Sequence, residues 1–278
     1  DQALDRIVEF ERMLAAEDVL VVKLWLHLAK DMQRRRLGDL EGDPDQSWRV
    51  TKTDWRFFRH YNKLRRISER VLRRTGTGEA PWTIIEGADA RYRNLTVARC
   101  LLDALRQRID AIAARPAREQ VPDRPVPKPV NVLGRIDLSA KLSDSKYERE
   151  LVKLTGRINL LCRRLRKERC SMLLVFEGPD AAGKGGAIRR LISAIDARLY
   201  RVQAVAAPSD EERARPYLWR FWRGLPRVGH VAIYDRSWYG RVLVERIEGF
   251  CAAHDWQRAY GEVNAFEEQL TDFGMIVI

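Results

Sequence analysis

The chain has 278 residues, of which 45% are hydrophobic and 32% charged, and its formal net charge is +12. This length is enough for one large or two small domains with a buried core. No apolar run approaches the roughly 20 residues that a bilayer span requires, and the N-terminal residues show no signal peptide. We therefore expect a globular cytoplasmic protein with no membrane partner.

The positive charge comes mainly from arginine, which makes up 41 of the 51 basic residues. A guanidinium group binds phosphate with two parallel hydrogen bonds, so this excess predicts a polyanionic partner: nucleic acid, nucleotide or an inorganic phosphate chain. The alternative is a set of solvated helix faces, which we expect to hold for most individual arginines.

The cysteines and histidines show no spacing typical of a metal site, a disulfide framework or a catalytic pair. We expect the cysteines to be reduced and buried, and we assign the histidines no role. The residues concerned are Cys100, Cys162, Cys170, Cys251, His27, His60, His230 and His254.

The first part of the chain predicts one helix, two strands, a basic helical region and a second long helix. The basic region is rich in charged and aromatic residues and predicts two or three exposed helices broken near Gly42. It is expected either to close over a phosphate-bearing ligand or to form a solvated hairpin. In order, the predicted elements are a helix at 1–15, a buried strand at 19–26, the basic region at 30–74, a strand at 81–86 and a helix at 94–112.

Five of the 11 prolines fall between Pro116 and Pro129. This density predicts an extended linker at 116–134 and a domain boundary. Strands and helices then alternate again, which predicts an α/β fold with a mostly parallel sheet, helices on both faces and a ligand at the carboxyl ends of the strands. The predicted elements are helices at 145–167, 188–195 and 211–222, and strands at 172–176, 202–206 and 231–235.

A glycine-rich stretch, Glu177 to Gly186, lies between the strand at 172–176 and the helix after it. Glycines allow backbone N–H groups to converge on a phosphate, and the start of the helix adds partial positive charge. Lys184 is placed to reach the outer phosphates. The alternative is a glycine-rich turn with a surface lysine. The predicted phosphate-binding residues here are Gly178, Ala182, Gly183, Lys184, Gly185 and Gly186.

One position departs from the usual phosphate-loop pattern, because Gly185 stands where a Ser or Thr hydroxyl would hold magnesium. Asp180, inside the loop, is a candidate to supply the missing oxygen ligand.

A second motif begins with Asp235, at the end of an apolar strand downstream of the loop. A carboxylate in this position organises magnesium in folds of this class. Arg236 and Arg241 are then candidates to neutralise charge on a transferring phosphoryl group. The alternative for Asp235 is a helix N-cap or a salt bridge to Arg236. These residues predict magnesium-assisted phosphoryl transfer, without identifying donor or acceptor.

An internal repeat aligns residues 10–22 with 266–278 without a gap, at an offset of 256. The match covers a helix end and an apolar strand. It predicts that residues 1–115 are the C-terminal half of one domain and residues 135–278 the N-terminal half of the next. We further expect the half-domains to complete each other, since the apolar strands near 19–26 and 274–278 would otherwise be exposed sheet edges.

The loop Glu177–Gly186, the run Leu218–Trp222 and the segment from Asp235 to Arg246 together resemble the polyphosphate kinase 2 family. In the front part, the segments from Trp25 to Trp48 and from Ala80 to Glu86 resemble the later half of that family's domain, which contains a helical lid. The resemblance covers nearly all of the chain except the linker.

This resemblance implies a P-loop kinase-like fold and magnesium-dependent transfer of phosphate between inorganic polyphosphate and a nucleotide. It implies that Asp180 and Asp235 bind metal and nucleotide, and that Lys184 and Arg236 contact phosphates. Some members carry two tandem copies and phosphorylate AMP. Here the lid precedes the loop, so Arg36, the implied lid residue, and Lys184 derive from different copies.

Two alternatives remain open at this point. One is an ATP-dependent nucleotide kinase of P-loop fold, against which Gly185 and the arginine excess both argue. The other is a non-catalytic polyanion-binding fragment. For the leading hypothesis the partners are polyphosphate and AMP or ADP, with no nucleic acid, and either a homo-oligomer or complementation between half-domains.

Overall fold

A computed structural model describes residues 2–114 and 133–278 of the chain. The chain divides into two compact units, unit 1 (Asp1–Arg118) and unit 2 (Glu119–Ile278). Most of the predicted linker at 116–134 lies outside the described residues. Within the described ranges, no helix is both long enough and apolar enough to cross a membrane.

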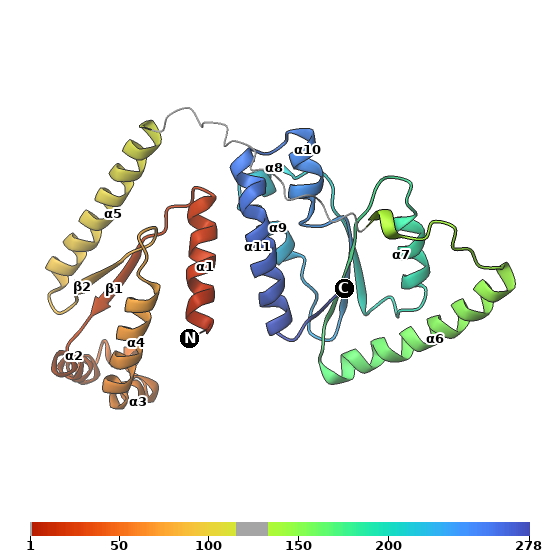
Figure 1. The fold of residues 1–278 in the computed structure, drawn as a ribbon. Coiled ribbons are helices and arrows are strands. Elements are labelled where there is room, and N and C mark those ends of the chain that lie inside the picture. The colour runs from red at the N-terminus through yellow and green to blue at the C-terminus, as the bar shows by residue number, and fades with distance from the viewer. Residues whose placement is uncertain (1, 115–132) are drawn as a thin grey trace. The chain divides into compact units, whose positions relative to one another are not determined.

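Unit 1 has a small parallel sheet between helices. In chain order it contains α1 (Gln2–Ala16), β1 (Lys23–His27), α2 (Lys30–Gly42), η1 (Ser47–Arg49), α3 (Lys52–Arg59), α4 (Tyr61–Thr75), β2 (Trp82–Glu86) and α5 (Ala90–Ala113). Strands β1 and β2 pair in parallel from Lys23 opposite Trp82 to His27 opposite Glu86. Helix α5 lies on one face of this sheet, and α1 and α4 lie on the other (Figure 1).

Unit 2 has a four-stranded sheet in the order β4-β5-β3-β6. Every pairing in it is parallel. In chain order the unit contains η2 (Leu133–Arg135), α6 (Asp144–Glu168), β3 (Met172–Phe176), α7 (Lys184–Ile192), β4 (Tyr200–Ala204), α8 (Asp210–Arg213), α9 (Trp219–Arg223), β5 (Val231–Asp235), η3 (Arg241–Glu245), α10 (Arg246–Glu248), α11 (Ala253–Asp272) and β6 (Ile276–Val277). The predicted α/β class with parallel sheets is confirmed.

The sheet of unit 2 is covered on both faces. Cys162 of α6 and Ile188 of α7 pack in one core with Leu174 of β3 and Ile233 of β5. On the other side, Phe266 of α11 packs edge-on against Trp238, with ring centroids 5.0 Å apart. Residues Val231 to Tyr234 of β5 are all buried, as expected for a central strand covered on both faces.

Five predicted elements are corrected by the structure. The helix predicted at 188–195 is α7, at Lys184–Ile192, and the helix predicted at 94–112 is α5, at Ala90–Ala113. The strand predicted at 19–26 begins only at Lys23, because its pairing with β2 starts at Lys23 opposite Trp82 and does not extend to residues 19–22. The strand predicted at 202–206 runs from Tyr200 to Ala204. The helix predicted at 211–222 is two short helices, α8 and α9, because Pro216 lies between them and cannot donate a helical hydrogen bond.

The cysteines are free, as predicted, but only Cys162 is buried. Cys100, Cys170 and Cys251 are half-buried, so the expectation that all four are buried is wrong. Burial raises the pKa of Cys162 and of Cys251.

The two repeat segments have the same local geometry. Asp18 and Gly274, which are 256 positions apart, both have positive φ, at 65° and 88°. The amide of Val19 donates to the carbonyl of Leu14, and that of Met275 to that of Leu270, both at 3.0 Å. Both helices therefore end in the same left-handed cap before an apolar strand.

Each described strand pairs within its own unit, so the two sheets are not joined by strand pairing. The prediction that the two half-domains of this chain complete each other is therefore wrong as far as strand pairing is concerned, because their strands form separate sheets.

A buried ion pair connects three elements of unit 1. Lys23, at the start of β1, donates to Glu11 of α1 at 2.7 Å and to the backbone carbonyl of Thr75 at the end of α4 at 2.5 Å. The side chains of Lys23 and Glu11 are only 8% and 11% exposed. Removing one partner of such a pair leaves an uncompensated buried charge.

We predict that Lys23→Met destabilises unit 1 by about 3–5 kcal/mol. The measurement is hydrogen-exchange protection of the β1 and β2 amides, which reports on this unit alone. Lys23→Met/Glu11→Leu is expected to recover at least half of the loss. The control is Asp5→Asn, which breaks the exposed pair with Arg74 and is expected to cost less than about 1 kcal/mol. Equal losses for Lys23→Met and the control would contradict the prediction.

Candidate active site

The two sequence motifs of unit 2 meet at one edge of its sheet. Strands β3 and β5 are parallel, and Phe176, the last residue of β3, lies opposite Asp235, the last residue of β5. The amide of Arg236 donates to the carbonyl of Phe176 at 3.0 Å. The loop after β3 and the motif after β5 therefore leave the sheet side by side.

The glycine-rich loop takes backbone conformations that glycine favours. Gly178 has φ 145° and Gly183 has φ 91°, and α7 begins directly after Gly183, at Lys184. Gly185 and Gly186 lie in the first turn of α7. The first four N–H groups of a helix have no acceptor within it, so these amides are available to an anion together with the positive end of the helix dipole.

Lys184 folds back over the loop. Its ammonium group donates to the carbonyls of Gly178 and Pro179, at 2.8 and 3.0 Å. The amide of Ala182 donates to the same Pro179 carbonyl at 3.3 Å. The lysine side chain is thus held against the loop by the loop's own backbone carbonyls.

Asp180 and Arg236 form an ion pair across the two motifs, with Nη2 and Oδ1 2.5 Å apart. Asp180 is 87% exposed and Arg236 39%, so the pair lies at the surface. Arg236 and Ala181 both have positive φ, 65° and 64°. Such strained conformations in non-glycine residues cluster at functional sites. Here one of them is a member of the ion pair, Arg236, and the other, Ala181, directly follows Asp180.

The structure adds two polar residues to which the sequence pattern assigned no role. Ser237 donates to the carboxylate of Glu177 at 2.7 Å and accepts from the amide of Tyr239 at 3.2 Å. Glu177 directly follows β3, and Ser237 comes two residues after the end of β5, so their position close behind the strand ends is the signal that points to them. Their hydrogen bond ties the second motif to the first residue of the phosphate loop.

An aromatic layer supports the second motif from behind. Trp238 and Tyr239 both donate to Glu267 of α11, each at 2.8 Å. Burial, together with the hydrogen bond to this carboxylate, raises the pKa of Tyr239 to about 12. Tyr217 donates to the carbonyl of Trp238 at 2.9 Å, and burial raises its pKa as well. The motif is therefore fixed by a network of neutral phenols.

Arg241, predicted to contact phosphate, has two partners in the fold. Its guanidinium lies 4.0 Å from the ring centroid of Tyr217 and 3.1 Å from the carboxylate of Glu245. The side chain is only 14% exposed. It belongs to η3, a single π-helical turn of a kind that often occurs at functional sites.

Arg36 belongs to unit 1, whereas Lys184 belongs to unit 2. Arg36 lies in α2 and donates to the carbonyls of Gly87 and Ala88, at 3.2 and 2.7 Å. These carbonyls follow β2, so Arg36 is anchored beside the carboxyl edge of the unit 1 sheet.

The described residues contain no group of three or more His, Cys, Asp or Glu side chains placed to hold a metal ion by themselves. Magnesium is commonly bound by only one or two carboxylates together with substrate phosphates. The donor set of Asp180, in the loop, and Asp235, at the end of the neighbouring strand, fits that mode.

This combination of loop, helix start and acid-ended strand is that of an α/β protein with the P-loop kinase-like fold. The chain belongs to the polyphosphate kinase 2 (PPK2) family, whose sequence profile matches residues 1–111 and 141–278. The two matched segments flank the proline-rich region.

Individual relatives match along the whole chain. A polyphosphate:AMP phosphotransferase of Pseudomonas aeruginosa is 48% identical over 285 residues, covering 100% of this chain and 56% of that protein. One from Acinetobacter johnsonii is 35% identical over 278 residues, covering 100% and 55%. The crystal structure of a polyphosphate kinase 2 from Pseudomonas aeruginosa superposes with a TM-score of 0.79 at 46% identity, covering 100% of this chain and 52% of that one. The chain thus spans about half the length of the relatives it matches.

We predict that Gly178→Ala destabilises unit 2 by about 1–3 kcal/mol, because φ of 145° is strained for any residue with a Cβ atom. The measurement is hydrogen-exchange protection of the β3 amides. Gly185→Ala is the matched control, because it lies in the same segment, in helix α7, with no atom within 4 Å of an added Cβ. It is expected to be neutral or stabilising by up to about 1 kcal/mol. Equal effects of the two variants would show that the loop conformation does not depend on Gly178.

Proposed function

We propose that the protein is a magnesium-dependent phosphotransferase that moves phosphate between inorganic polyphosphate and a nucleotide, and that it phosphorylates AMP to ADP. The observation that carries the proposal is that the phosphate loop, which contains Asp180 and Lys184, lies beside Arg236 of the second motif at one edge of the sheet. The substrates are suggested by relatives that share 47–48% identity along the full chain and are named polyphosphate:AMP phosphotransferases.

The residues at this edge can position and neutralise phosphates without forming a covalent intermediate. The amides of Gly183 to Gly186 are available to phosphate oxygens, and Lys184 is held close to them by the loop carbonyls. Arg236 presents a guanidinium beside the same loop. Positioning and charge neutralisation are the main requirements of phosphoryl transfer, and these groups would supply them together with bound magnesium.

Asp180 and Asp235 are the residues we propose to hold magnesium. The metal, when bound, would supply positive charge to the phosphate oxygens. Gly185 offers no hydroxyl for this purpose, so the carboxylates carry the role that a Ser or Thr has in other phosphate loops.

We also propose that the two units are halves of two tandem kinase-like domains, residues 1–115 and 135–278, with Arg36 serving as a lid residue in the first. The repeat supports this, because Phe266 is buried at 1% exposure whereas its equivalent Phe10 is 45% exposed, as expected if its aromatic partners lie outside unit 1. A two-stranded sheet is also marginal alone. A structure of a longer form in which β1 gains no further neighbouring strand would refute this proposal.

The cytoplasm is the proposed place of action, since the four cysteines are free thiols. We propose no nucleic-acid or membrane partner for the activity.

The test is an assay of pure protein with AMP or ADP, magnesium and either polyphosphate or ATP. The proposal predicts AMP phosphorylation with polyphosphate and its loss when the metal is chelated. Turnover with ATP and none with polyphosphate would instead indicate an ATP-dependent nucleotide kinase. Inactivity with both donors would favour a polyanion-binding role.

We predict that Asp180→Asn lowers turnover by about 100-fold or more, because a positioned charge is lost, while the fold is retained because the side chain is 87% exposed. The matched control is Asp210→Asn, which removes another exposed carboxylate paired with an arginine, Arg213, and should leave turnover unchanged. Near-parental activity of Asp180→Asn would remove Asp180 from the mechanism.

A further inference from the structure

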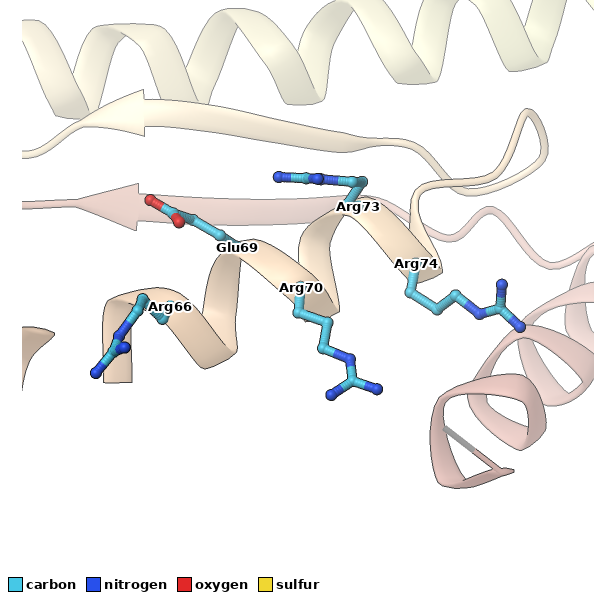
Figure 2. Close-up of a pocket in the computed structure, with 5 residues that line it drawn as sticks. All are labelled: Arg66, Glu69, Arg70, Arg73 and Arg74. Carbon is cyan, nitrogen blue, oxygen red and sulfur yellow. The ribbon is translucent and has the colours of Figure 1, made fainter. Parts of the chain in front are cut away.

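Helix α4 of unit 1 carries a row of exposed arginines. Arg66, Arg70 and Arg74 are four residues apart, so they share one face of the helix. With Glu69 and Arg73 they line a surface hollow of about 420 Å³. In Figure 2 the side chains of the three arginines point away from strands β1 and β2, toward the same side of α4.

The charge of α4 is strongly one-sided. Its sequence contains six basic residues and a single acid, Glu69. Glu69 lies 3.6 Å from Arg65, and Arg74 is paired with Asp5 of α1 at 2.7 Å. Within the helix itself, basic residues thus outnumber acidic ones six to one.

Such a row opposes helix stability. Arg66 and Arg70, and Arg70 and Arg74, are like charges at i and i+4, which repel one another on a helix surface. A bound polyanion would reverse this effect, because each phosphate would lie between neighbouring guanidinium groups. The arrangement therefore favours a ligand with several phosphates in a line over a single small anion.

We propose that the arginine row of α4 is a second binding site for inorganic polyphosphate, distinct from the phosphate loop at Lys184. This inference rests on the proposed function for the identity of the polyanion. The helical rise places Arg66 and Arg74 about 12 Å apart along the axis, enough for a run of several phosphates. Guanidinium groups bind such phosphates through paired, charge-assisted hydrogen bonds.

The composition of the hollow favours polyphosphate over nucleic acid. Proteins that bind single-stranded nucleic acid combine basic side chains with aromatic rings on which bases stack. The five residues that line the hollow are four arginines and one glutamate, with no aromatic ring. The hollow therefore offers contacts to phosphate but no aromatic ring on which a base could stack.

The site has a consequence for chain-length preference. A polyphosphate that is long enough can bind the arginine row and a phosphate loop at once. Once it is bound at one of these sites, it meets the other at a high effective concentration, which a short chain does not. Loss of the row is therefore expected to raise the KM for long polyphosphate while kcat stays unchanged.

The direct test is binding of fluorescently labelled long-chain polyphosphate to the full 278-residue chain, measured by anisotropy over a range of salt concentrations. Arg66→Gln/Arg70→Gln is expected to weaken binding about tenfold. It is also expected to reduce the slope of log affinity against log salt by about two, because the variant neutralises two fewer phosphates.

The matched control is Arg99→Gln/Arg106→Gln, which removes two exposed arginines from α5, on the opposite face of the same sheet (Figure 1). It loses the same charge and is expected to bind like the parent. Arg66→Lys/Arg70→Lys keeps the charge without the guanidinium fork and is expected to bind with intermediate affinity.

Three results would overturn the proposal. Equal weakening by the α4 and α5 variants would indicate a general effect of net charge. Unchanged binding in Arg66→Gln/Arg70→Gln would identify the row as a solvated face. Equal or greater loss of binding to a labelled single-stranded oligonucleotide would assign the row to nucleic acid or to polyanions in general.

This measurement is independent of turnover. If the parent protein fails to phosphorylate AMP, the proposed function fails, yet the binding comparison still decides whether α4 holds polyphosphate. If turnover is present and only the binding comparison fails, the active site stands and the second site does not.

Discussion

The register between β3 and β5 determines where the chemistry of this chain lies. Because Phe176 is opposite Asp235 in a parallel pair, the phosphate loop and the second motif emerge at the same edge although 56 residues separate Asp180 from Arg236. A slip of one residue would turn the strand's side chains to the other face and move the acid away from the loop. The buried residues of β5, from Val231 to Tyr234, oppose such a slip because they fill both faces of the sheet.

Much of this arrangement follows from local sequence. The strand, glycine loop and helix around Lys184, and the apolar run that ends at Asp235, are contiguous patterns whose type is set by periodicity and by glycine. The family resemblance added the substrate class and linked Asp180 to Asp235. The repeat at an offset of 256 also has a structural counterpart, since Asp18 and Gly274 occupy equivalent left-handed caps.

Other features depend on contacts that no local pattern contains. The Asp180–Arg236 pair and the Ser237–Glu177 hydrogen bond join residues from two loops and arise only once the sheet has formed. The placement of Arg241 over Tyr217 depends on a π-helical turn that its sequence does not indicate. The prediction of one helix at 211–222 is wrong because it followed the amphipathic periodicity and did not take into account that Pro216 interrupts a helix. Strand ends near 19 and 206 were misplaced because apolar residues continue beyond the paired parts of the strands, at 19–22 and 205–206.

The two hydrogen bonds of Lys184 also bear on how the loop meets an anion. Its ammonium already has acceptors in the carbonyls of Gly178 and Pro179. When a phosphate binds this lysine, the ammonium therefore exchanges its carbonyl acceptors for phosphate oxygens, because it has no unpaired state from which to start. The affinity for phosphate that we propose for this lysine would then be a difference between two hydrogen-bonded states, and it would grow with the charge of the incoming group because the displaced carbonyls are neutral. The proposed loop would therefore favour highly charged phosphate groups.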